Sequence, residues 1–239
     1  MIRYSILHEK NPREIVLLRG VGCRWRKCTF CDYHLDCSAD ERQNLELNRR
    51  VLSNVTGCYH RLEVINSGSF PELGELTLRE LTGLCREKAI DTLHFECHYR
   101  FRDAIPEWRA AFAEAGTTLK IKTGIETFDA DYRERVLRKG IEERDPAKLA
   151  EFFDECCLLF GLPGQTAASM RQDIETALTY FERVCVNIFA ANRTKIKPDP
   201  DVIAVFTEQV LPLYRNMERV DILMENTDFG VGAEDTHEQ

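Results

Sequence analysis

The sequence contains no apolar run that approaches the ~20 residues of a membrane span. Its polar start, MIRYSILH, lacks the long apolar stretch of a secretory signal, so we expect a cytoplasmic protein. It also lacks linkers, low-complexity segments and repeats of fixed period. With 239 residues, 44% hydrophobic and 30% charged, it predicts one globular domain over residues 1–239. Without a secretory signal, its ten cysteines are expected to stay reduced.

Basic residues are too few for a large nucleic-acid footprint. The chain has 32 Lys and Arg against 40 Asp and Glu, a net charge of −8. Neutralising phosphates requires a basic face, so a nucleic-acid partner is disfavoured and a small molecule is favoured. A tRNA substrate stays open as an alternative, because a local basic patch fits within an acidic chain.

The most informative stretch is residues 20–38, where three thiols have the spacing C-x4-C-x2-C: Cys23, Cys28 and Cys31. Three thiolates satisfy three irons of a cubic [4Fe–4S] cluster and leave the fourth iron open to a small molecule. Two other interpretations remain. A zinc site would need Cys37 or His34 as a further ligand, since a second close pair of cysteines is missing. The thiols could also be unliganded.

Short β-rich runs alternate with helical patterns along the chain. Strands are expected at 14–20, 62–67, 91–97, 118–124, 155–160 and 185–190, with a further strand at 220–224. Helices are expected from a capping box at 77–80 to about 88, around 170–181, and over 201–216. Six βα units predict an α/β fold, a partial (β/α)6 TIM-like barrel with a parallel sheet and outer helices.

Polar residues follow the predicted strands. The site of a parallel barrel lies at the carboxyl edge of its strands, and the cysteine loop follows the first of them directly. The other strands lead into 66–69, 96–98, 124–126 and 161–164. Glu96 and His98, two apart on one predicted strand, are expected on the same side, where they could also satisfy each other.

Taken in order, these motifs resemble the radical S-adenosylmethionine (SAM) superfamily over nearly the whole chain, most closely the branch of coproporphyrinogen dehydrogenases and methylthiotransferases. The resemblance makes Cys23, Cys28 and Cys31 cluster ligands. It implies an amine-binding turn at 66–70, a ribose-binding residue at the end of 124–129, and an arginine that pairs with the SAM carboxylate, Arg138. The implied SAM-binding residues are Phe30, Asn66, Ser67, Gly68, Ser69, Glu126, Arg138 and Gly161.

Two departures and two simpler interpretations accompany the resemblance. The family usually places three residues between its first two cysteines, whereas this chain has four, and Cys157 replaces a ribose-binding aspartate found in some relatives. Glu126 and Arg138 could form a surface ion pair. Residues 66–69 could be only a strand-ending turn.

As the resemblance implies, SAM chelates the open iron, and an electron from a donor such as flavodoxin or ferredoxin cleaves it to methionine and a 5′-deoxyadenosyl radical. That radical abstracts hydrogen from the substrate. Because the chain has no room for the domains that larger members append, it looks most like the compact queuine lyases, which cut free queuine to the aminomethyl-deazaguanine base preQ1. Alternatives are a radical SAM enzyme acting on tRNA or another small metabolite, and a non-catalytic iron–sulfur or zinc protein.

Carboxylates are expected to read a guanine-like edge, because that edge presents N–H donors. The segment 220–232, rich in acceptors and glycine, is expected to close the barrel on a ligand, with a solvated tail as the alternative. No catalytic side chain is predicted. The candidate substrate-binding residues are Glu63, Glu96, His98, Asp221, Glu225, Asn226 and Asp228.

Overall fold

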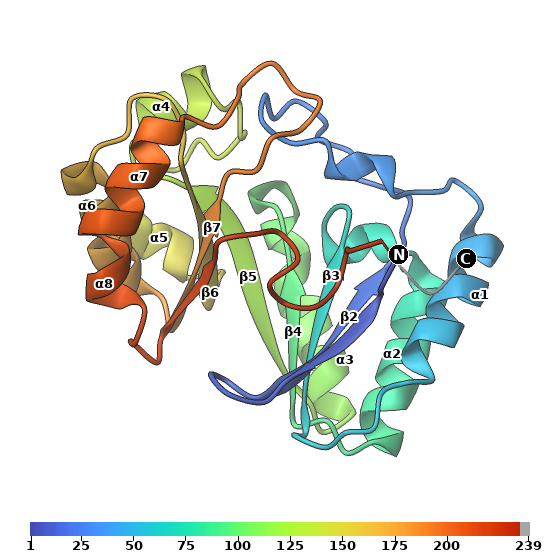
Figure 1. Cartoon of the computed structure of the whole chain (residues 1–239). Coiled ribbons are helices and arrows are strands. Elements are labelled where there is room, and N and C mark those ends of the chain that lie inside the picture. The colour runs from blue at the N-terminus through green and yellow to red at the C-terminus, as the bar shows by residue number, and fades with distance from the viewer. Residues whose placement is uncertain (235–239) are drawn as a thin grey trace. The chain divides into compact units, whose positions relative to one another are not determined.

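The computed structural model describes residues 1–234 (Figure 1). Its contacts divide the chain into two compact units, each described by itself. The first unit comprises Met1–Arg24, Tyr33–Ile121 and the residues from Thr227 onward. The second unit comprises Trp25–Asp32 and Lys122–Asn226.

The first unit contains four complete strands and the start of a fifth. Its strands are β1 (Tyr4–Leu7), β2 (Arg13–Leu18), β3 (Arg61–Asn66), β4 (Thr92–Glu96) and the first half of β5 (Thr118–Glu126). Its helices are η1 (Tyr33–Leu35), α1 (Glu41–Leu52), η2 (Phe70–Leu73), α2 (Glu75–Glu87), η3 (Tyr99–Ala104) and α3 (Ile105–Glu114). Strand β1 pairs antiparallel with β2, while β2, β3 and β4 are parallel.

The second unit continues the alternation from the second half of β5. Its strands are β6 (Glu155–Phe160), β7 (Arg183–Ile188) and β8 (Val220–Leu223), and β5 to β8 are parallel. Its helices are α4 (Ala130–Arg135), α5 (Pro146–Ala150), α6 (Ala167–Tyr180), α7 (Pro200–Gln209) and α8 (Leu211–Tyr214). Helices α6 and α7 both pack on β6 (Figure 1).

The strand order in the sheet follows the chain order from β1 to β8. This order, with helices between the parallel strands, confirms the predicted α/β fold of the partial-barrel type. All six residues of β6 are buried, as expected for a parallel strand covered on both faces. The predicted strand at 220–224 is confirmed as β8.

The helix boundaries needed correction at two places. Helix α2 begins at Glu75, with Gly74 at its N-cap, so the predicted capping box at 77–80 is wrong. Thr77 is instead buried, and its hydroxyl accepts a hydrogen bond of 3.1 Å from Asn48 Nδ2. The predicted helix at 201–216 is divided into α7 and α8 near Pro212, which has no N–H to continue a helix.

The chain ends of the first unit pack together, which the sequence did not predict. Strand β1 was missed, and Ile2 exchanges backbone hydrogen bonds with Gly232 and Ala233, at 2.9 and 2.8 Å. Phe229 is buried beneath the Arg13 guanidinium, which lies 4.9 Å from the centre of its ring. Residues 227–233 are therefore not a solvated tail.

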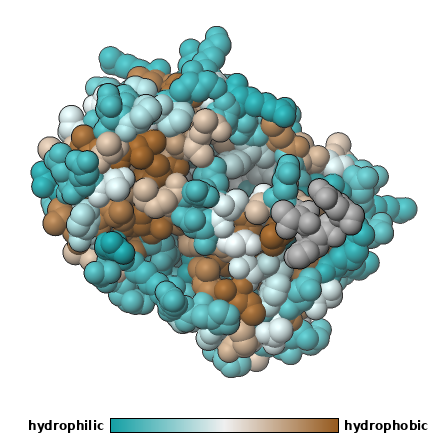
Figure 2. Space-filling model, in the orientation of Figure 1, coloured by the Kyte–Doolittle hydropathy of each residue, from teal (hydrophilic) through white to brown (hydrophobic). Residues whose placement is uncertain are grey.

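The face of the molecule that Figure 2 shows is mixed in polarity. In the view of Figure 2, hydrophilic residues predominate, and hydrophobic ones form separate patches, one of them near the part where Figure 1 draws α7. Within residues 1–234, no helix is long and apolar enough to cross a membrane.

One buried carboxyl makes the stability of the second unit depend on pH. Asp173 on α6 accepts a 2.8 Å hydrogen bond from the Phe128 backbone N–H, yet burial raises its pKa from 3.8 to about 6. The folded state thus holds this proton more tightly than the unfolded chain. The stabilisation is fully present below about pH 4 and is lost as the pH rises through about 6.

We therefore expect the free energy of unfolding of the wild-type protein to fall, relative to that of Asp173→Asn, between pH 4 and pH 7. The difference should be at most ~3 kcal/mol, since each pKa unit corresponds to about 1.4 kcal/mol. Urea unfolding at several pH values measures it. Parallel pH profiles for the two proteins would contradict the prediction.

Candidate functional site

The second unit holds two of the predicted cluster cysteines in a well-anchored loop. Cys28 and Cys31 are half-buried and pack against an apolar cluster that includes Phe30 and Phe189. The backbone of Thr29 donates to Leu137 O at 3.0 Å, and its hydroxyl donates to the carbonyl of Val136 at 2.6 Å. This loop is therefore fixed to the segment that follows α4.

Further hydrogen bonds anchor the same loop, two of them from residues 192–193. Asn192 Nδ2 donates to Phe30 O at 2.6 Å, and the Arg193 backbone N–H donates to Asp32 Oδ2 at 3.1 Å. Trp25 Nε1 donates to the carbonyl of Arg138 at 2.8 Å. The thiols of Cys28 and Cys31 thus lie on a loop whose backbone is held by contacts remote in sequence.

The third predicted ligand, Cys23, belongs to the first unit. Its N–H donates to Ser67 O at 3.0 Å, and a Cβ added at Gly68 would lie 3.1 Å from that same nitrogen and 2.5 Å from Glu72 Oε2. A side chain at 68 would displace the Glu72 carboxylate and crowd the Cys23 backbone. The predicted amine-binding turn and the predicted cluster cysteine are therefore in direct contact.

Glu72 organises this contact, and the sequence reasoning missed it. Its buried carboxylate accepts from Arg24 N at 2.6 Å and from Ser69 N at 2.7 Å. One side chain therefore holds the residue after Cys23 and the end of the turn. A glutamate three residues after Ser69 is the signal that could have found it, since the two form a capping box on η2.

Asn66 ends strand β3 with an unsatisfied acceptor. Its side chain is buried and its Nδ2 donates to Ser69 O at 3.3 Å, but its Oδ1 has no hydrogen-bond partner. A buried polar atom left unpaired costs about 1–3 kcal/mol. Residue 66 therefore presents a buried acceptor that a donor from outside the chain would satisfy.

His98 is not on a strand with Glu96, which corrects the sequence prediction. Strand β4 ends at Glu96, and His98 is the N-cap of η3, where its Nδ1 accepts from Arg100 N at 3.2 Å. The His98 backbone N–H donates to the Ser69 hydroxyl at 2.9 Å. The end of β4 and the turn at 66–69 are thus joined within the first unit.

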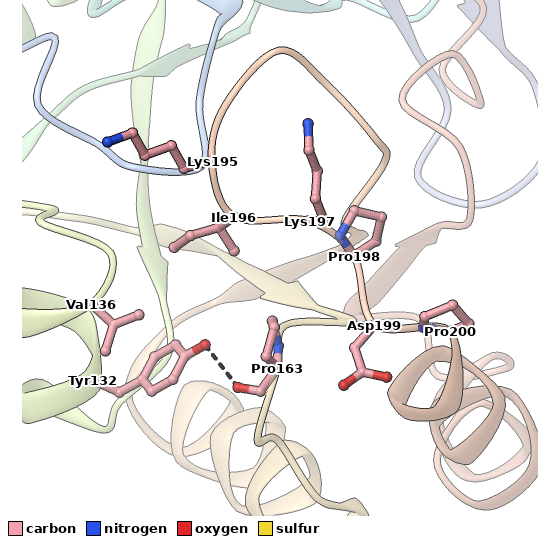
Figure 3. A pocket seen from close by; sticks show the side chains of 9 residues that line it. All are labelled: Tyr132, Val136, Pro163, Lys195, Ile196, Lys197, Pro198, Asp199 and Pro200. Atoms are coloured by element: carbon pink, nitrogen blue, oxygen red, sulfur yellow. Dashed lines mark hydrogen bonds between the residues drawn. The ribbon is translucent and has the colours of Figure 1, made fainter.

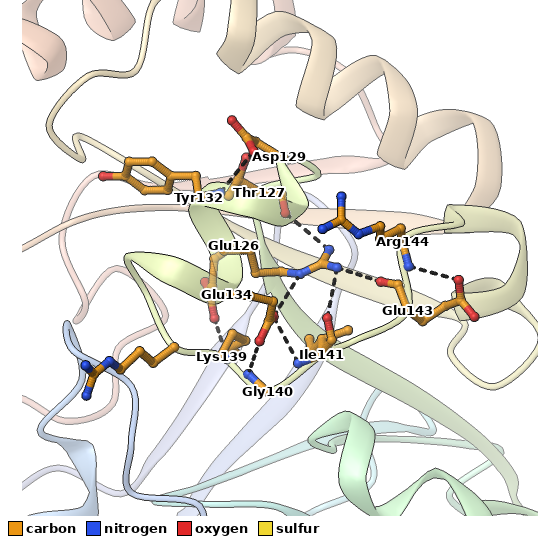
Figure 4. Close-up of polar contacts among 12 residues, drawn as sticks. Glu126, Thr127, Asp129, Tyr132, Glu134, Lys139, Gly140, Ile141, Glu143 and Arg144 are labelled. Carbon is orange, nitrogen blue, oxygen red and sulfur yellow. Dashed lines mark hydrogen bonds and ion pairs between the residues drawn. The ribbon is translucent and has the colours of Figure 1, made fainter.

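Glu126 has a different partner from the one considered from sequence. Lys139 Nζ, not the Arg138 guanidinium, donates to Glu126 Oε1 at 2.6 Å, and both side chains are mostly buried (Figure 4). A Cβ at Gly124 would lie 2.6 Å from that carboxylate and 2.7 Å from Lys139 Nζ. Gly124 therefore leaves the room that the pair occupies.

The charge state of Lys139 is set by the anionic groups around it. Burial alone would lower the pKa of Lys139, but the Glu126 carboxylate and the sulfurs of Cys28 and Cys31 outweigh it and raise that pKa above its usual value. Lys139 was missed from sequence. It brings positive charge beside two predicted cluster thiols, where thiolate charge would gather.

The backbone at Glu126 and Arg138 is strained. Their φ angles are +68° and +54°, in the left-handed region that residues other than glycine seldom adopt. Register also shifts between Gly124 and Glu126 as β5 pairs with β6. Such strain persists only where the surroundings hold it, and it concentrates at functional sites.

A buried arginine holds the segment that carries Arg138 and Lys139. The Arg133 guanidinium donates to the carbonyls of Ile141 and Glu143, at 3.0 and 2.6 Å. Glu134 accepts from the backbone N–H groups of Gly140 and Ile141, at 2.8 and 3.0 Å. Two adjacent residues of α4, one cationic and one anionic, therefore hold residues 140–143 in place.

Two predicted substrate carboxylates are already neutralised. Glu63 is buried in an ion pair of 2.5 Å with Arg13, and Asp221 pairs at 2.5 Å with Arg183. Of the others, Glu96 ends β4 in the first unit and Asp228 lies there too, whereas Glu225 and Asn226 follow β8 in the second.

The remaining predictions concern the SAM site and the metal. Gly161, in the second unit, has a φ of +88°, and a Cβ there would lie 2.8 Å from Ile203. Ser67 donates its hydroxyl to Asp36 O at 2.6 Å. Over residues 1–234, no group of three or more His, Cys, Asp or Glu side chains is arranged as a metal site, and all ten cysteines are free thiols.

Comparison with known proteins identifies the family. A partial α/β barrel whose first parallel strand leads into a three-cysteine loop defines the class of radical SAM enzymes. No protein-family model and no curated protein matches the chain. Among solved structures, a queuine lyase from Clostridium spiroforme bound to SAM and queuine matches with a TM-score of 0.93 and 42% identity, over 98% of this chain and 100% of that chain. The chain belongs to the queuine lyase family.

Proposed function

We propose that this protein is a radical SAM lyase of queuine salvage, which cleaves free queuine to the aminomethyl-deazaguanine base preQ1. The observation that carries the proposal is the likeness, over the full length of both chains, to a lyase bound to SAM and queuine. A TM-score of 0.93 at 42% identity means that the fold is shared along nearly the whole chain. The acidic net charge of −8 favours a free base over tRNA.

The residues present fit a cluster and SAM. Cys23, Cys28 and Cys31 would hold a [4Fe–4S] cluster, since three thiolates are its ligands and Lys139 supplies compensating charge. The buried Oδ1 of Asn66 is an acceptor that the SAM amine would satisfy. When bound, the reduced cluster and SAM together supply a 5′-deoxyadenosyl radical, which takes hydrogen from the cyclopentenediol ring of queuine.

The chain supplies placement and charge. Arg138 would pair with the SAM carboxylate, and Glu126, held by Lys139 at 2.6 Å, would be part of the SAM site. Phe30, Ser67, Gly68, Ser69 and Gly161 would complete the SAM site. Glu63 and Asp221 are held by arginines and would read the deazaguanine edge from fixed positions, with Glu96, His98, Glu225, Asn226 and Asp228 as further contacts. A displacement of about 1 Å at a reacting centre costs roughly a hundredfold in rate, which is why fixed positions matter.

An electron donor is also needed, and we propose an acidic carrier such as flavodoxin or ferredoxin. A cytoplasmic location would supply both the carrier and a reducing environment for the ten free thiols.

Replacing Asn66 by leucine tests the amine site. Leucine removes the unpaired acceptor, and Ser69 O keeps its bond from Glu72 N at 2.8 Å, so the free energy of unfolding should stay the same or rise slightly. SAM affinity should fall about 10- to 150-fold, the equivalent of one hydrogen bond to a charged group. Calorimetry on the reconstituted protein measures the affinity, and urea unfolding the stability. Unchanged SAM affinity would show that the amine binds elsewhere.

The substrate is tested with the reduced, anaerobically reconstituted protein, SAM and queuine. We expect 5′-deoxyadenosine and preQ1 to form together, as measured by mass spectrometry. Asp228→Asn should weaken queuine binding more than it slows SAM cleavage without substrate. Asp201→Asn, on the exposed first turn of α7, is the matched control and should behave as wild type. Deoxyadenosine with intact queuine would reject the substrate and leave the enzyme class standing.

A further inference from the structure

The second unit has an open surface pocket of about 520 Å³ that the proposed reaction does not use (Figure 3). Tyr132, Val136, Pro163 and Ile196 form its apolar part. The Tyr132 hydroxyl donates to the carbonyl of Pro163 at 2.9 Å, which joins α4 to the loop after β6. Val136 is 40% exposed, so the apolar part is open to a partner.

This pocket is built on the residues that hold the cluster loop. Tyr132 and Ile196 pack against the same apolar cluster as Cys28 and Cys31. On one wall, the Val136 carbonyl accepts from the Thr29 hydroxyl at 2.6 Å. On the other, Asn192, at the start of the segment that carries Ile196, donates to Phe30 O at 2.6 Å. A partner in the pocket would therefore contact residues that share one apolar cluster with Cys28 and Cys31.

The rim of the pocket is positively charged in an acidic chain. Arg193, Lys195 and Lys197 alternate along the segment with half-buried residues and are exposed, and Lys197 Nζ also donates to the Asn192 carbonyl at 2.5 Å. Lys195 and Lys197 line the pocket itself and extend away from Pro163 (Figure 3). Asp199, the one carboxylate in the lining, is engaged at the N-cap of α7, where it accepts from Asp201 N at 3.0 Å.

We propose that this pocket and its basic rim are the docking site of an acidic electron-carrier protein that reduces the cluster. The inference rests on the proposed function, because only a redox cluster at Cys28 and Cys31 gives such a partner a purpose. One electron passes from the reduced flavin or iron–sulfur centre of the carrier to the cluster, and no atom is transferred. Opposite charges speed such encounters, and redox encounters use small interfaces, below about 1,200 Å².

A second copy of the chain suits this surface less well. In a two-fold dimer the same patch meets itself, which would place Arg193, Lys195 and Lys197 opposite their own copies. Like charges brought together oppose association, whereas an acidic carrier neutralises them.

The test uses the reconstituted holoenzyme, reduced flavodoxin as the probe, and formation of 5′-deoxyadenosine from SAM in the absence of queuine. The test variant is Arg193→Glu/Lys195→Glu, which reverses two exposed charges. The control is Lys148→Glu/Arg171→Glu, an equal charge change on the exposed faces of α5 and α6. We expect the flavodoxin concentration at half-maximal rate to rise about tenfold for the test variant only. The effect should shrink as salt increases, because salt screens exposed charges.

Titanium(III) citrate, a small reductant that needs no docking site, separates the outcomes. With it, wild type and both variants should form 5′-deoxyadenosine at equal rates, which also shows that the variants are folded. Equal dependence on flavodoxin in the test and control variants would overturn the docking site alone. A wild-type protein that binds no cluster would overturn the proposed function together with the inference. A dimer of the holoenzyme that Val136→Asp dissociates would assign the surface to a second copy and overturn the proposal.

Discussion

Cys28→Ala should leave the protein unable to hold a cluster. The wild-type protein, reconstituted anaerobically with iron and sulfide, should bind about four irons per chain, whereas the variant should bind almost none, because a three-thiolate site cannot lose a ligand. SAM cleavage should disappear with the cluster. The same loss is expected for Cys23→Ala and Cys31→Ala. Iron and sulfide analysis, together with the visible absorbance of the cluster, measures the result.

Two other half-exposed or exposed thiols give matched controls. Cys37 follows the three-cysteine stretch in sequence and belongs to the first unit, where its backbone forms an isolated β-bridge with Gly20. Cys58 is an exposed thiol elsewhere in that unit. Their alanine variants should keep the cluster. Metal analysis that finds zinc in place of iron, or a Cys37 variant that loses its metal, would favour the zinc interpretation. Retained cluster absorbance in Cys28→Ala would remove the three-thiol assignment.

The strands could be predicted because the residues that they bury are adjacent or alternate in the sequence. Residues 156–160 form an unbroken apolar run after Glu155, and β6 occupies 155–160. Strand β1 was missed because it is short and only half-buried, and its pairing with β2 is decided by contacts at the chain ends. The predicted start of helix α2 was wrong because a buried contact outweighed the local capping signal. The Thr77 hydroxyl accepts a hydrogen bond from Asn48 instead of capping the helix.

The site motifs could be named from sequence, but their contacts could not. The resemblance implied a SAM-binding role for Glu126 and Arg138, and the simpler interpretation was a surface ion pair between the two. The left-handed backbone at Arg138 is followed by Lys139, whose ammonium group lies against Glu126. Glu96 and His98 were expected on one strand because alternation was extended two residues too far, past the end of β4. One residue of drift in register changes the partner of a side chain, and no local pattern fixes it.

The buried guanidinium of Arg133 shows the same limit, since the sequence gives no reason to prefer it over Arg135 two residues later. Arg133 is 1% exposed and donates to carbonyls of the 140–143 segment, whereas the Arg135 side chain is 80% exposed and lies 3.8 Å from Asp131. Burial lowers the pKa of Arg133, while Glu134 works in the opposite direction to keep it charged. The charged guanidinium of Arg133 thus helps to hold the second unit together.

Arg133→Ala should therefore destabilise the protein by about 3–5 kcal/mol, because it leaves the buried carbonyls of Ile141 and Glu143 without their donor and breaks the ion pair with Glu134. Arg135→Ala, the matched control on the same helix, should cost less than about 0.5 kcal/mol, as exposed ion pairs do. Urea unfolding measures both. In the reconstituted protein, Arg133→Ala should also weaken SAM binding, because the segment that carries Arg138 and Lys139 loses its anchor while every proposed SAM ligand is still present. If the two alanine variants unfold at the same urea concentration, the guanidinium is not the anchor of that segment, and the strained backbone at Arg138 is held by other contacts.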